Sequence, residues 1–324
     1  MKKHYIQFFV FICILLISIG SLHNPFTNDY VKGLKESPDA IHVTSKGDQL
    51  LNEIEKRAIE YSIPAEDAKI DPVWKATPGI NGLEVDIQAS YKKMKKDDVF
   101  NENKLVFRQV PPNVHLEDLP PSPIYRGHLS KPIVSFLINV AWGNEYIPDM
   151  LETLKKHNVK ATFFLEGRWV KENPDLAKMI VDAGHEVGNH SYTHPKMETL
   201  SSDLVKEELI KTNQVIEAAT GKKPTLFAPP SGGYRDEVVK IADELGMKTI
   251  LWSVDTIDWQ RPQPHVLVKR VMGKVHPGAF VLMHPTSPTA QSLERLILSI
   301  KQKNLAIDNV STLLNEERII LKKK

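Results

Sequence analysis

The stretch Pro132–Glu166 reads PIVSFLINVAWGNEYIPDMLETLKKHNVKATFFLE and indicates the fold of the larger part of the chain. It holds an apolar strand at Ile133–Asn139, an amphipathic helix at Pro148–His157 and a second apolar strand at Ala161–Glu166. Apolar strands separated by segments of helix length are typical of a parallel sheet covered by helices. The stretch therefore predicts an α/β fold.

The same alternation continues toward the carboxyl end of the chain. Further strands are predicted at Glu186–His190, Thr225–Pro229, Thr249–Ser253, Ala279–His284 and Ala306–Val310. Further helices are predicted at Asp175–Ala183, Ser201–Ala219, Asp236–Leu245 and Thr289–Lys303. About seven such units favour a closed or nearly closed (β/α) barrel over an open sheet, and functional side chains are then expected at the carboxyl ends of the strands.

Residues 1–24 predict an export segment. Lys2 and Lys3 precede an uncharged apolar run, Ile6–Leu22, which has the length of a signal peptide or of a membrane anchor. Ser18–Gly20 is a poor cleavage site, so a cleaved signal peptide and an uncleaved anchor both stay open. Either segment directs the remainder of the chain out of the cytoplasm, and an uncleaved one would also attach it to the membrane.

The composition excludes several classes of protein. The chain has 324 residues and carries 42 Lys and Arg against 40 Asp and Glu, so its net charge of +2 gives no case for a nucleic-acid partner. Its single cysteine, Cys13, lies within the apolar run and cannot form an internal disulfide. The length exceeds that of one ordinary core, which indicates a large domain with additions. We expect a monomer.

Residues 25–127 form a less regular amino-terminal module. Helices are predicted at Gly47–Tyr61 and Val85–Met94, and both a small α+β module and a helical hairpin are consistent with them. Six prolines in Pro111–Pro132 disfavour a helix and suit an extended tie or linker. We therefore divide the chain into an export segment at 1–24, this module at 25–127 and the barrel at 128–324.

A pair of histidines follows the third predicted strand of the barrel. The segment Gly184–Pro195, GHEVGNHSYTHP, places His190 at the end of the strand and His194 four residues later. Two imidazoles at such a turn can converge on one divalent cation, with Zn favoured and Co or Ni as alternatives. Two surface histidines are the competing interpretation.

Other strand ends also carry polar side chains. A backbone N–H near Ser231, in LFAPPSGG, is a candidate oxyanion donor, or the segment is only a structural turn. Asp255 and Asp258, in LWSVDTIDWQ, can orient histidines or serve as turn residues. His284 directly follows another apolar strand and is a candidate general acid, against the alternative of a structural histidine.

Taken in this order, the motifs resemble those of the polysaccharide deacetylase family, also called the NodB-homology or carbohydrate esterase 4 family, over about Pro132–Leu314. The matching motifs are GHEVGNHSYTHP, WSVDTIDW and LMHP, and the pair Trp142-Gly143 resembles the branch found in spore-forming Gram-positive bacteria. The resemblance implies a distorted (β/α) barrel and metal-dependent removal of acetyl groups from glycans. It also implies a metal on His190 and His194, catalysis by His284 with Asp258, and substrate contacts at Ser231 and Trp259.

Three positions depart from the family pattern. Asn139 stands where the family has its general base, Val140 where it has an aspartate ligand, and Ala228 where it has an arginine. A carboxamide cannot abstract a proton from water, and Glu145, Glu166 or the Asp255/Asp258 pair are weak substitutes. With two protein ligands the metal would be weakly bound.

Two hypotheses follow for the function. The retained histidines favour an exported deacetylase of a Gram-positive cell wall, acting on peptidoglycan or a chitin-like glycan. The alternative is a catalytically inactive protein of the same fold that binds glycan or a partner, because Asn139, Val140 and Ala228 replace the base, the metal ligand and the arginine.

Overall fold

The computed structural model describes residues 48–319. The predictions for residues 1–24, including those for Cys13, lie outside the described residues. Among residues 48–319, no helix is both long and apolar enough to cross a bilayer. Of the described residues, 54–319 belong to one compact unit.

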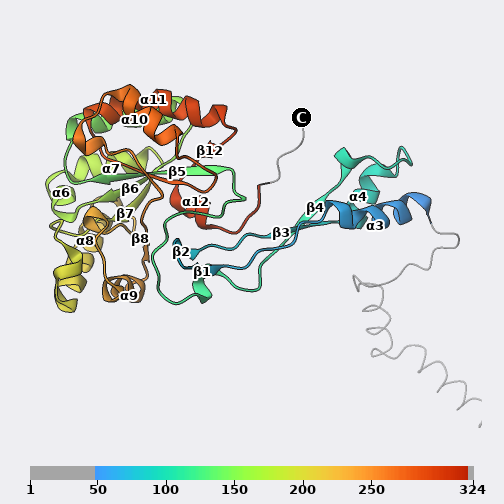
Figure 1. The fold of residues 1–324 in the computed structure, drawn as a ribbon, viewed down its shortest axis with the longest axis horizontal. Helices are drawn as coiled ribbons and strands as arrows, with labels where there is room; N and C mark the ends of the chain where they lie inside the picture. The colour runs from blue at the N-terminus through green and yellow to red at the C-terminus, as the bar shows by residue number, and fades with distance from the viewer. Residues whose placement is uncertain (1–47, 320–324) are drawn as a thin grey trace, which may run out of the picture. The chain divides into compact units, whose positions relative to one another are not determined.

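An eight-stranded parallel sheet forms the centre of this unit (Figure 1). Seven strands follow the order β10-β11-β5-β6-β7-β8-β9. The eighth strand, β12, pairs with the first two residues of β5, Ile133 and Val134. The strands are β5 (Ile133–Val140), β6 (Thr162–Leu165), β7 (Glu186–Asn189), β8 (Leu226–Phe227), β9 (Lys248–Thr249), β10 (Val254–Asp255), β11 (Phe280–Met283) and β12 (Ala306–Ile307). The path ends at β9 and β10, so the sheet is curled like a barrel but not closed. The predicted α/β fold and distorted barrel are confirmed.

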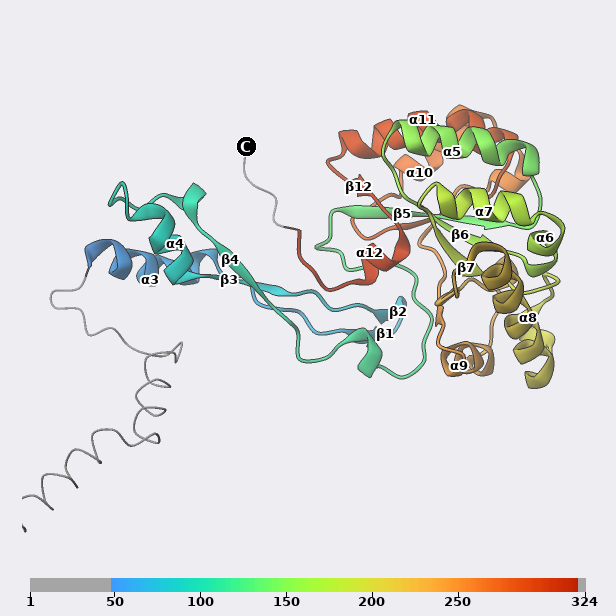
Figure 2. The same cartoon turned by 180° about the vertical axis from the view of Figure 1, so that it is seen from behind.

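Helices cover the sheet, and α5, α10 and α11 lie side by side on it (Figures 1 and 2). The helices are α5 (Ile147–Lys156), α6 (Gly167–Glu172), α7 (Pro174–Asp182), α8 (Ser202–Thr220), α9 (Asp236–Glu244), α10 (Pro264–Met272), α11 (Ser287–Gln302) and α12 (Val310–Leu314). Local chemistry sets their ends: Ser201 caps the start of α8 and accepts from the N–H of Leu204, and Gly221 ends the helix at a φ of 69°.

The central strand β5 is buried on both faces and separates two apolar cores. Val134, Phe136, Ile138 and Val140 belong to the outer core between the sheet and the helices. Ile133 and Leu137 belong to the inner core, inside the curl of the sheet. Because side chains alternate along a strand, Asn139 shares the inner face with Leu137. This alternation decides which side chains can reach the interior of the barrel.

The predicted strand at Thr249–Ser253 is only partly right. Pairing with β8 ends at Thr249, and the chain then crosses to β11, where β10 forms a strand that the sequence pattern does not predict. The backbone between them takes other partners, since the N–H of Leu251 donates to the carbonyl of Ile124 and that of Ser253 to the carbonyl of Phe280. Hydrogen bonds to these distant segments therefore satisfy the backbone groups that a longer β9 would have paired within the sheet.

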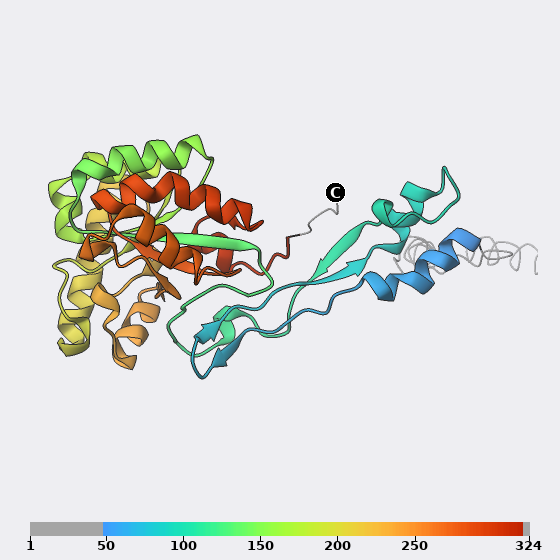
Figure 3. The same ribbon diagram turned by 45° about the horizontal axis from the view of Figure 1, so that its top comes forward.

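The amino-terminal module is a small α+β structure, so the helical-hairpin alternative is wrong (Figure 3). The two predicted helices are present as α3 (Gln49–Tyr61) and α4 (Ile87–Met94). Two antiparallel pairs accompany them, β1 (Lys69–Asp71) with β2 (Lys75–Thr77) and β3 (Gly82–Val85) with β4 (Phe107–Val110). Asp86 caps α4 by accepting from the N–H of Ala89 at 2.8 Å.

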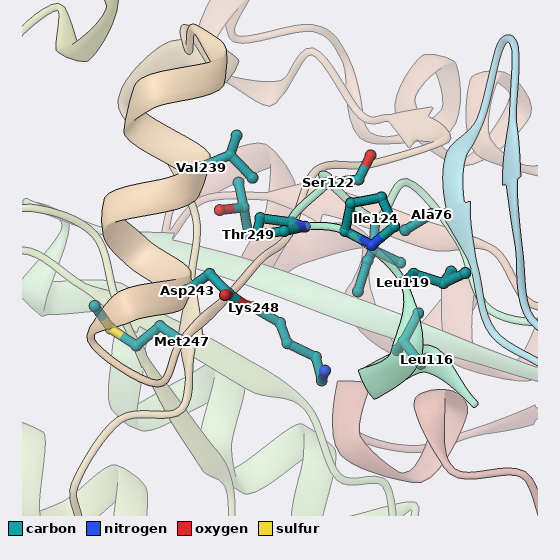
Figure 4. A pocket seen from close by; sticks show the side chains of 12 residues that line it. Ala76, Leu116, Leu119, Ser122, Ile124, Val239, Asp243, Met247, Lys248 and Thr249 are labelled. Carbon is teal, nitrogen blue, oxygen red and sulfur yellow. The ribbon is translucent and has the colours of Figure 1, made fainter. Parts of the chain in front are cut away.

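The proline-rich segment 111–132 packs against the barrel. Ile124 forms bridges with Ile250 beyond β9 and with Lys75 in β2, and its side chain is buried in the inner core. Figure 4 shows Leu116 and Leu119 of this segment on one side of a pocket whose other side carries Met247. The segment is therefore a packed tie between the module and the barrel, and the domain boundary near residue 127 stays a prediction.

A buried histidine next to β6 should make stability depend on pH. His185 is 7% exposed, its Nδ1 accepts from the N–H of Ala161 at 3.2 Å, and burial, with Lys160 nearby, lowers its pKa to about 4. Between pH 6.5 and 4 the unfolded chain binds a proton that the folded chain excludes, so the free energy of unfolding should fall by up to about 3 kcal/mol. His185→Gln should lose this part of the slope in urea titrations, whereas the exposed control His265→Gln should keep it; equal slopes in all three proteins would contradict the assignment.

Candidate functional site

A cavity of about 420 Å³ opens at the carboxyl ends of the barrel strands. Its lining residues are Asn139, Ala141, Trp142, His190, His194, Ser231, Trp252, Asp255, Trp259, Leu282 and His284. They come from β5, β10 and β11 and from the loops after β5, β7, β8, β9, β10 and β11. Of the seven candidate site residues, the fold brings six to this cavity and leaves Asp258 outside its lining.

The paired histidines are neutral imidazoles, and a hydrogen bond fixes the orientation of the His190 ring. His190 is almost fully buried, and its Nδ1 lies 2.7 Å from the carbonyl oxygen of Ala228, to which it donates. Burial, with His194 nearby, lowers the pKa of His190 to about 3, and burial also lowers the pKa of His194. The ring centroids are 5.0 Å apart at an interplanar angle of 72°. His190 Nε2 therefore keeps a free lone pair beside a second imidazole.

The loop that carries His194 is fixed by residues that sequence reasoning missed. The carboxylate of Glu208, on α8, accepts from the N–H groups of Tyr192 and Thr193 at 2.8 Å each. Asn189 Oδ1 accepts from the N–H of Ser191 at 2.8 Å. Ser191 and His194 adopt left-handed backbone angles, with φ of 61° and 56°, which these bonds help to maintain. Glu208 sits in an ordinary amphipathic helix, so no local pattern points to it.

His284 is held by a fully buried carboxylate. Asp258 Oδ1 lies 2.8 Å from Nδ1 of His284, and Oδ2 accepts from the backbone N–H of His284 at 2.6 Å. Thr289 adds a hydroxyl bond of 2.6 Å to the same Oδ2. Asp258 therefore acts through His284 as a positioning residue, and only His284 lines the cavity. The sequence pattern marks Thr289 only as the start of a helix.

Aromatic rings surround the cavity. Trp142 stacks on His284 with ring centroids 5.8 Å apart and an interplanar angle of 10°, yet remains 47% exposed. Trp259 is 55% exposed. The glycine after Trp142 is required, because a Cβ on Gly143 would lie 2.0 Å from the carbonyl oxygen of Pro285. The turn after β5 and the turn after β11 thus pack closely, which places Trp142 over His284.

The three departures from the deacetylase pattern have different surroundings. Asn139 is 4% exposed and lines the cavity, and its Oδ1 is buried without a hydrogen-bond partner among the described residues. Val140 does not line the cavity, because its side chain lies in the outer core with Ile138 and Met283. Ala228 is buried and contributes its carbonyl to His190. None of the three brings a charge to the site.

The substitute base Glu166 has a structural role. Its Oε2 accepts from the N–H of Trp169 at 2.9 Å, which caps α6, and its side chain does not line the cavity. Burial raises the pKa of this carboxyl. Asp255 is the carboxylate that lines the cavity, and its Oδ1 accepts from the N–H of Ile257 at 2.7 Å. Asp255 is thus the remaining candidate for a carboxylate near the histidines.

The donor set does not match a three-ligand metal site. His190 and His194 offer two imidazole nitrogens, and the position where a carboxylate ligand is expected holds the apolar Val140. Within residues 48–319, no three His, Cys, Asp or Glu side chains converge in a way that would hold a metal ion. Catalytic zinc sites usually have three protein ligands, so the residues present do not fit a catalytic metal of that kind.

Comparison with known proteins agrees with the motifs. Residues 126–250 match the sequence profile of polysaccharide deacetylases. The peptidoglycan-N-acetylmuramic acid deacetylase PdaA of Bacillus subtilis is 32% identical over 202 residues, which cover 61% of this chain and 77% of PdaA. The chain belongs to the polysaccharide deacetylase family. This family is carbohydrate esterase family 4, which includes several peptidoglycan deacetylases.

Two further relatives are more similar in sequence. The uncharacterized protein YlxY of Bacillus subtilis is 52% identical over 320 residues, or 99% of this chain and 100% of YlxY. BA3943 of Bacillus anthracis, described as a family 4 pseudoenzyme, is 60% identical over 84% of this chain and 97% of its own, with a TM-score of 0.80. A mutant of BA3943 is described as having restored enzymatic activity, with 60% identity and a TM-score of 0.79 over 83% of this chain and 99% of its own.

A carboxylate at position 140 should destabilise this member of the polysaccharide deacetylase family. Val140 is fully buried among apolar side chains, so Val140→Asp should lower the free energy of unfolding by at least about 3 kcal/mol. The matched control is Ala141→Asp, one residue later, because Ala141 lines the cavity and its carboxylate would be solvated. Urea unfolding of both variants checks this; equal stability losses would mean that residue 140 can turn into the cavity.

Proposed function

We propose that this protein is a glycan-binding member of the polysaccharide deacetylase family that does not hydrolyse its ligand. The observation that carries the proposal is Asn139, whose carboxamide lines the cavity, at the position that the motif resemblance assigns to the family's general base. A carboxamide has no protonation state that accepts a proton from water near neutral pH. The protein therefore keeps the cavity, and position 139 lacks the carboxylate that would activate water.

The comparisons support this alternative better than the deacetylase hypothesis that the retained histidines favour. BA3943 is described as a pseudoenzyme and shares 60% of its residues with this chain over the aligned part. A mutant of BA3943 is described as having restored enzymatic activity, so substitutions can turn an inactive member of the family into an active one. In this chain too, the three histidines His190, His194 and His284 still line the cavity.

The cavity has the character of a neutral carbohydrate site. Trp142 and Trp259 expose large ring surfaces at its edge, where an amphipathic ring can stack on the C–H face of a sugar. Neutral His190 and the oxygen of Asn139, which has no hydrogen-bond partner within residues 48–319, offer acceptors to hydroxyl and amide N–H groups. We propose an acetylated cell-wall glycan, peptidoglycan or chitin-like, as the ligand, bound without hydrolysis.

The export segment in the sequence completes this proposal. We propose that the protein acts as a monomer outside the cytoplasm, at the outer face of the membrane or in the cell wall of a Gram-positive, spore-forming bacterium. A metal has only a minor role in the proposed function. His190 and His194 would hold Zn, Co or Ni weakly, through two nitrogens and water. Calorimetric titration with Zn should show binding that His190→Ala abolishes.

Calorimetric titration of the full chain with acetylated chito-oligosaccharide and with peptidoglycan fragments tests the proposal. We expect saturable binding, no acetate release over hours, and weaker binding by Trp259→Ala. The matched control is Leu204→Ala on α8, which also removes an exposed apolar side chain, here 48% exposed, away from the cavity. Steady acetate release by the unchanged chain, or no binding of either glycan, would overturn the proposal.

A further inference from the structure

Four side chains of the module and the barrel meet outside the lining of the cavity. Trp74 lies in the turn between β1 and β2, Tyr125 and Arg126 follow the bridge residue Ile124, and Tyr234 lies in the loop after β8. We call Trp74, Tyr125, Arg126 and Tyr234 the hairpin cluster. None of the four side chains lines the cavity described above.

The hairpin cluster is connected by direct contacts. The guanidinium carbon of Arg126 lies 4.5 Å from the centroid of the Trp74 ring. Trp74 and Tyr125 meet edge to face, with centroids 6.4 Å apart at 70°. The hydroxyl oxygens of Tyr125 and Tyr234 are 3.2 Å apart. Side chains of the hairpin, the tie and the barrel therefore form one connected cluster.

The hairpin turn holds Trp74 in a fixed position. Asp71 Oδ1 accepts from the N–H groups of Val73 and Trp74 at 2.8 Å each. Lys75 is bridged to Ile124, which is itself bridged to Ile250 of the barrel. The ring is thus ordered before any ligand arrives, which lowers the conformational cost of binding.

Arg126 is held by stacking and charge, while its hydrogen-bonding capacity is not fully used. Its guanidinium is stacked on Trp74, and Asp71 attracts it electrostatically. Its Nε is buried without a hydrogen-bond partner among the described residues. Among the described residues no carboxylate forms a salt bridge with Arg126. A half-buried guanidinium without such a partner is suited to an oxyanion from a ligand, and its planar shape matches a carboxylate.

A loop joins the hairpin cluster to the cavity. Ser231 and Trp252 line the cavity, and Trp252 packs on Gly232, where an added Cβ would lie 2.8 Å from its ring. Tyr234 follows two residues later and meets Tyr125. Residues 231–234 therefore connect the lining of the cavity to the hairpin cluster along the chain.

We propose that the hairpin cluster is a second glycan subsite, which binds an acidic sugar through its carboxylate. Trp74 and Tyr125 supply ring surfaces for the sugar, and Arg126 pairs with the carboxylate. The proposal rests on the proposed glycan-binding function and gives the amino-terminal module a part in it: the module selects chains that alternate neutral and carboxylate-bearing sugars over wholly neutral ones.

Two tetrasaccharides of equal length test the subsite on the full chain. One is the neutral chitotetraose, and the other alternates N-acetylglucosamine with N-acetylmuramic acid, which carries a carboxylate. Calorimetry should show that the unchanged chain prefers the acidic tetrasaccharide by about tenfold or more. Arg126→Gln should remove that preference while leaving the affinity for chitotetraose unchanged, whereas Trp74→Ala, which removes a stacking surface, should weaken the binding of both tetrasaccharides.

The control is Arg108→Gln, which removes an exposed arginine of the same module that pairs with Glu84; it should keep the preference. Arg126→Lys keeps the charge without the planar fork and should retain only part of it. Equal affinity for both tetrasaccharides, or an equal loss for both in Arg126→Gln, would overturn the subsite alone. Binding of neither by the unchanged chain would overturn the proposed function itself. A glycerol phosphate oligomer that competes better than the acidic tetrasaccharide would also overturn the carboxylate assignment.

Discussion

Asn139→Asp should give this protein acetate-releasing activity at least about a hundredfold above that of the unchanged chain. A carboxylate at the end of β5 would line the same cavity as His190, His194 and His284 and could take the proton of an attacking water. A positioned general base contributes about 10²–10⁴ to the rate. His284, held by Asp258, is already placed to serve as the acid. Acetate release from chito-oligosaccharide, measured with Zn or Co supplied, checks the gain.

Two controls separate the base from a general effect of charge. Asn139→Ser should stay inactive, because a hydroxyl cannot accept the proton either. Asn304→Asp makes the same chemical change at an exposed position beyond α11 and should also stay inactive. Activity of the unchanged chain equal to that of Asn139→Asp would show that the amide is not what prevents hydrolysis.

Asp258→Ala should lower the free energy of unfolding by about 3–5 kcal/mol. The carboxylate is fully buried and accepts from the backbone N–H of His284, from its Nδ1 and from the hydroxyl of Thr289. Removing it leaves buried donors without a partner, and losing one member of a buried pair typically has an effect of this size. Denaturant unfolding monitored by tryptophan fluorescence measures the loss.

The matched control for this prediction is Asp255→Ala, three residues earlier. Asp255 lines the cavity and makes one bond, to the N–H of Ile257, so its removal should lower the free energy of unfolding by only about 1 kcal/mol. Asp258→Asn should fall between the two, because an amide keeps one acceptor oxygen. A loss below about 1 kcal/mol for Asp258→Ala would mean that His284 and Thr289 find other partners.

The arrangement of the barrel could be predicted because strands such as Ile133–Asn139 are apolar throughout and bounded by helices. The strand at Val254–Asp255 could not be predicted, because two residues carry no periodicity and their pairing depends on Val281 and Leu282. The packing of Ile124 between Lys75 and Ile250 is equally non-local. The six prolines of residues 111–132 indicated an extended chain. Only the contacts of this segment in the folded protein show that it packs against the barrel.

The sequence by itself determined that the barrel is parallel, that Asn139, His190, Ser231 and His284 meet at one edge, and that position 139 carries no charge. These follow from residue type, from strand periodicity and from the shared direction of parallel strands. Only the tertiary structure decided that Val140 turns into the outer core, that Asp258 is buried beneath His284, and that Trp74 and Arg126 meet beside Tyr234. These features depend on which face of a strand is turned inward and on contacts between distant segments. A local sequence pattern predicts neither the orientation nor the contacts.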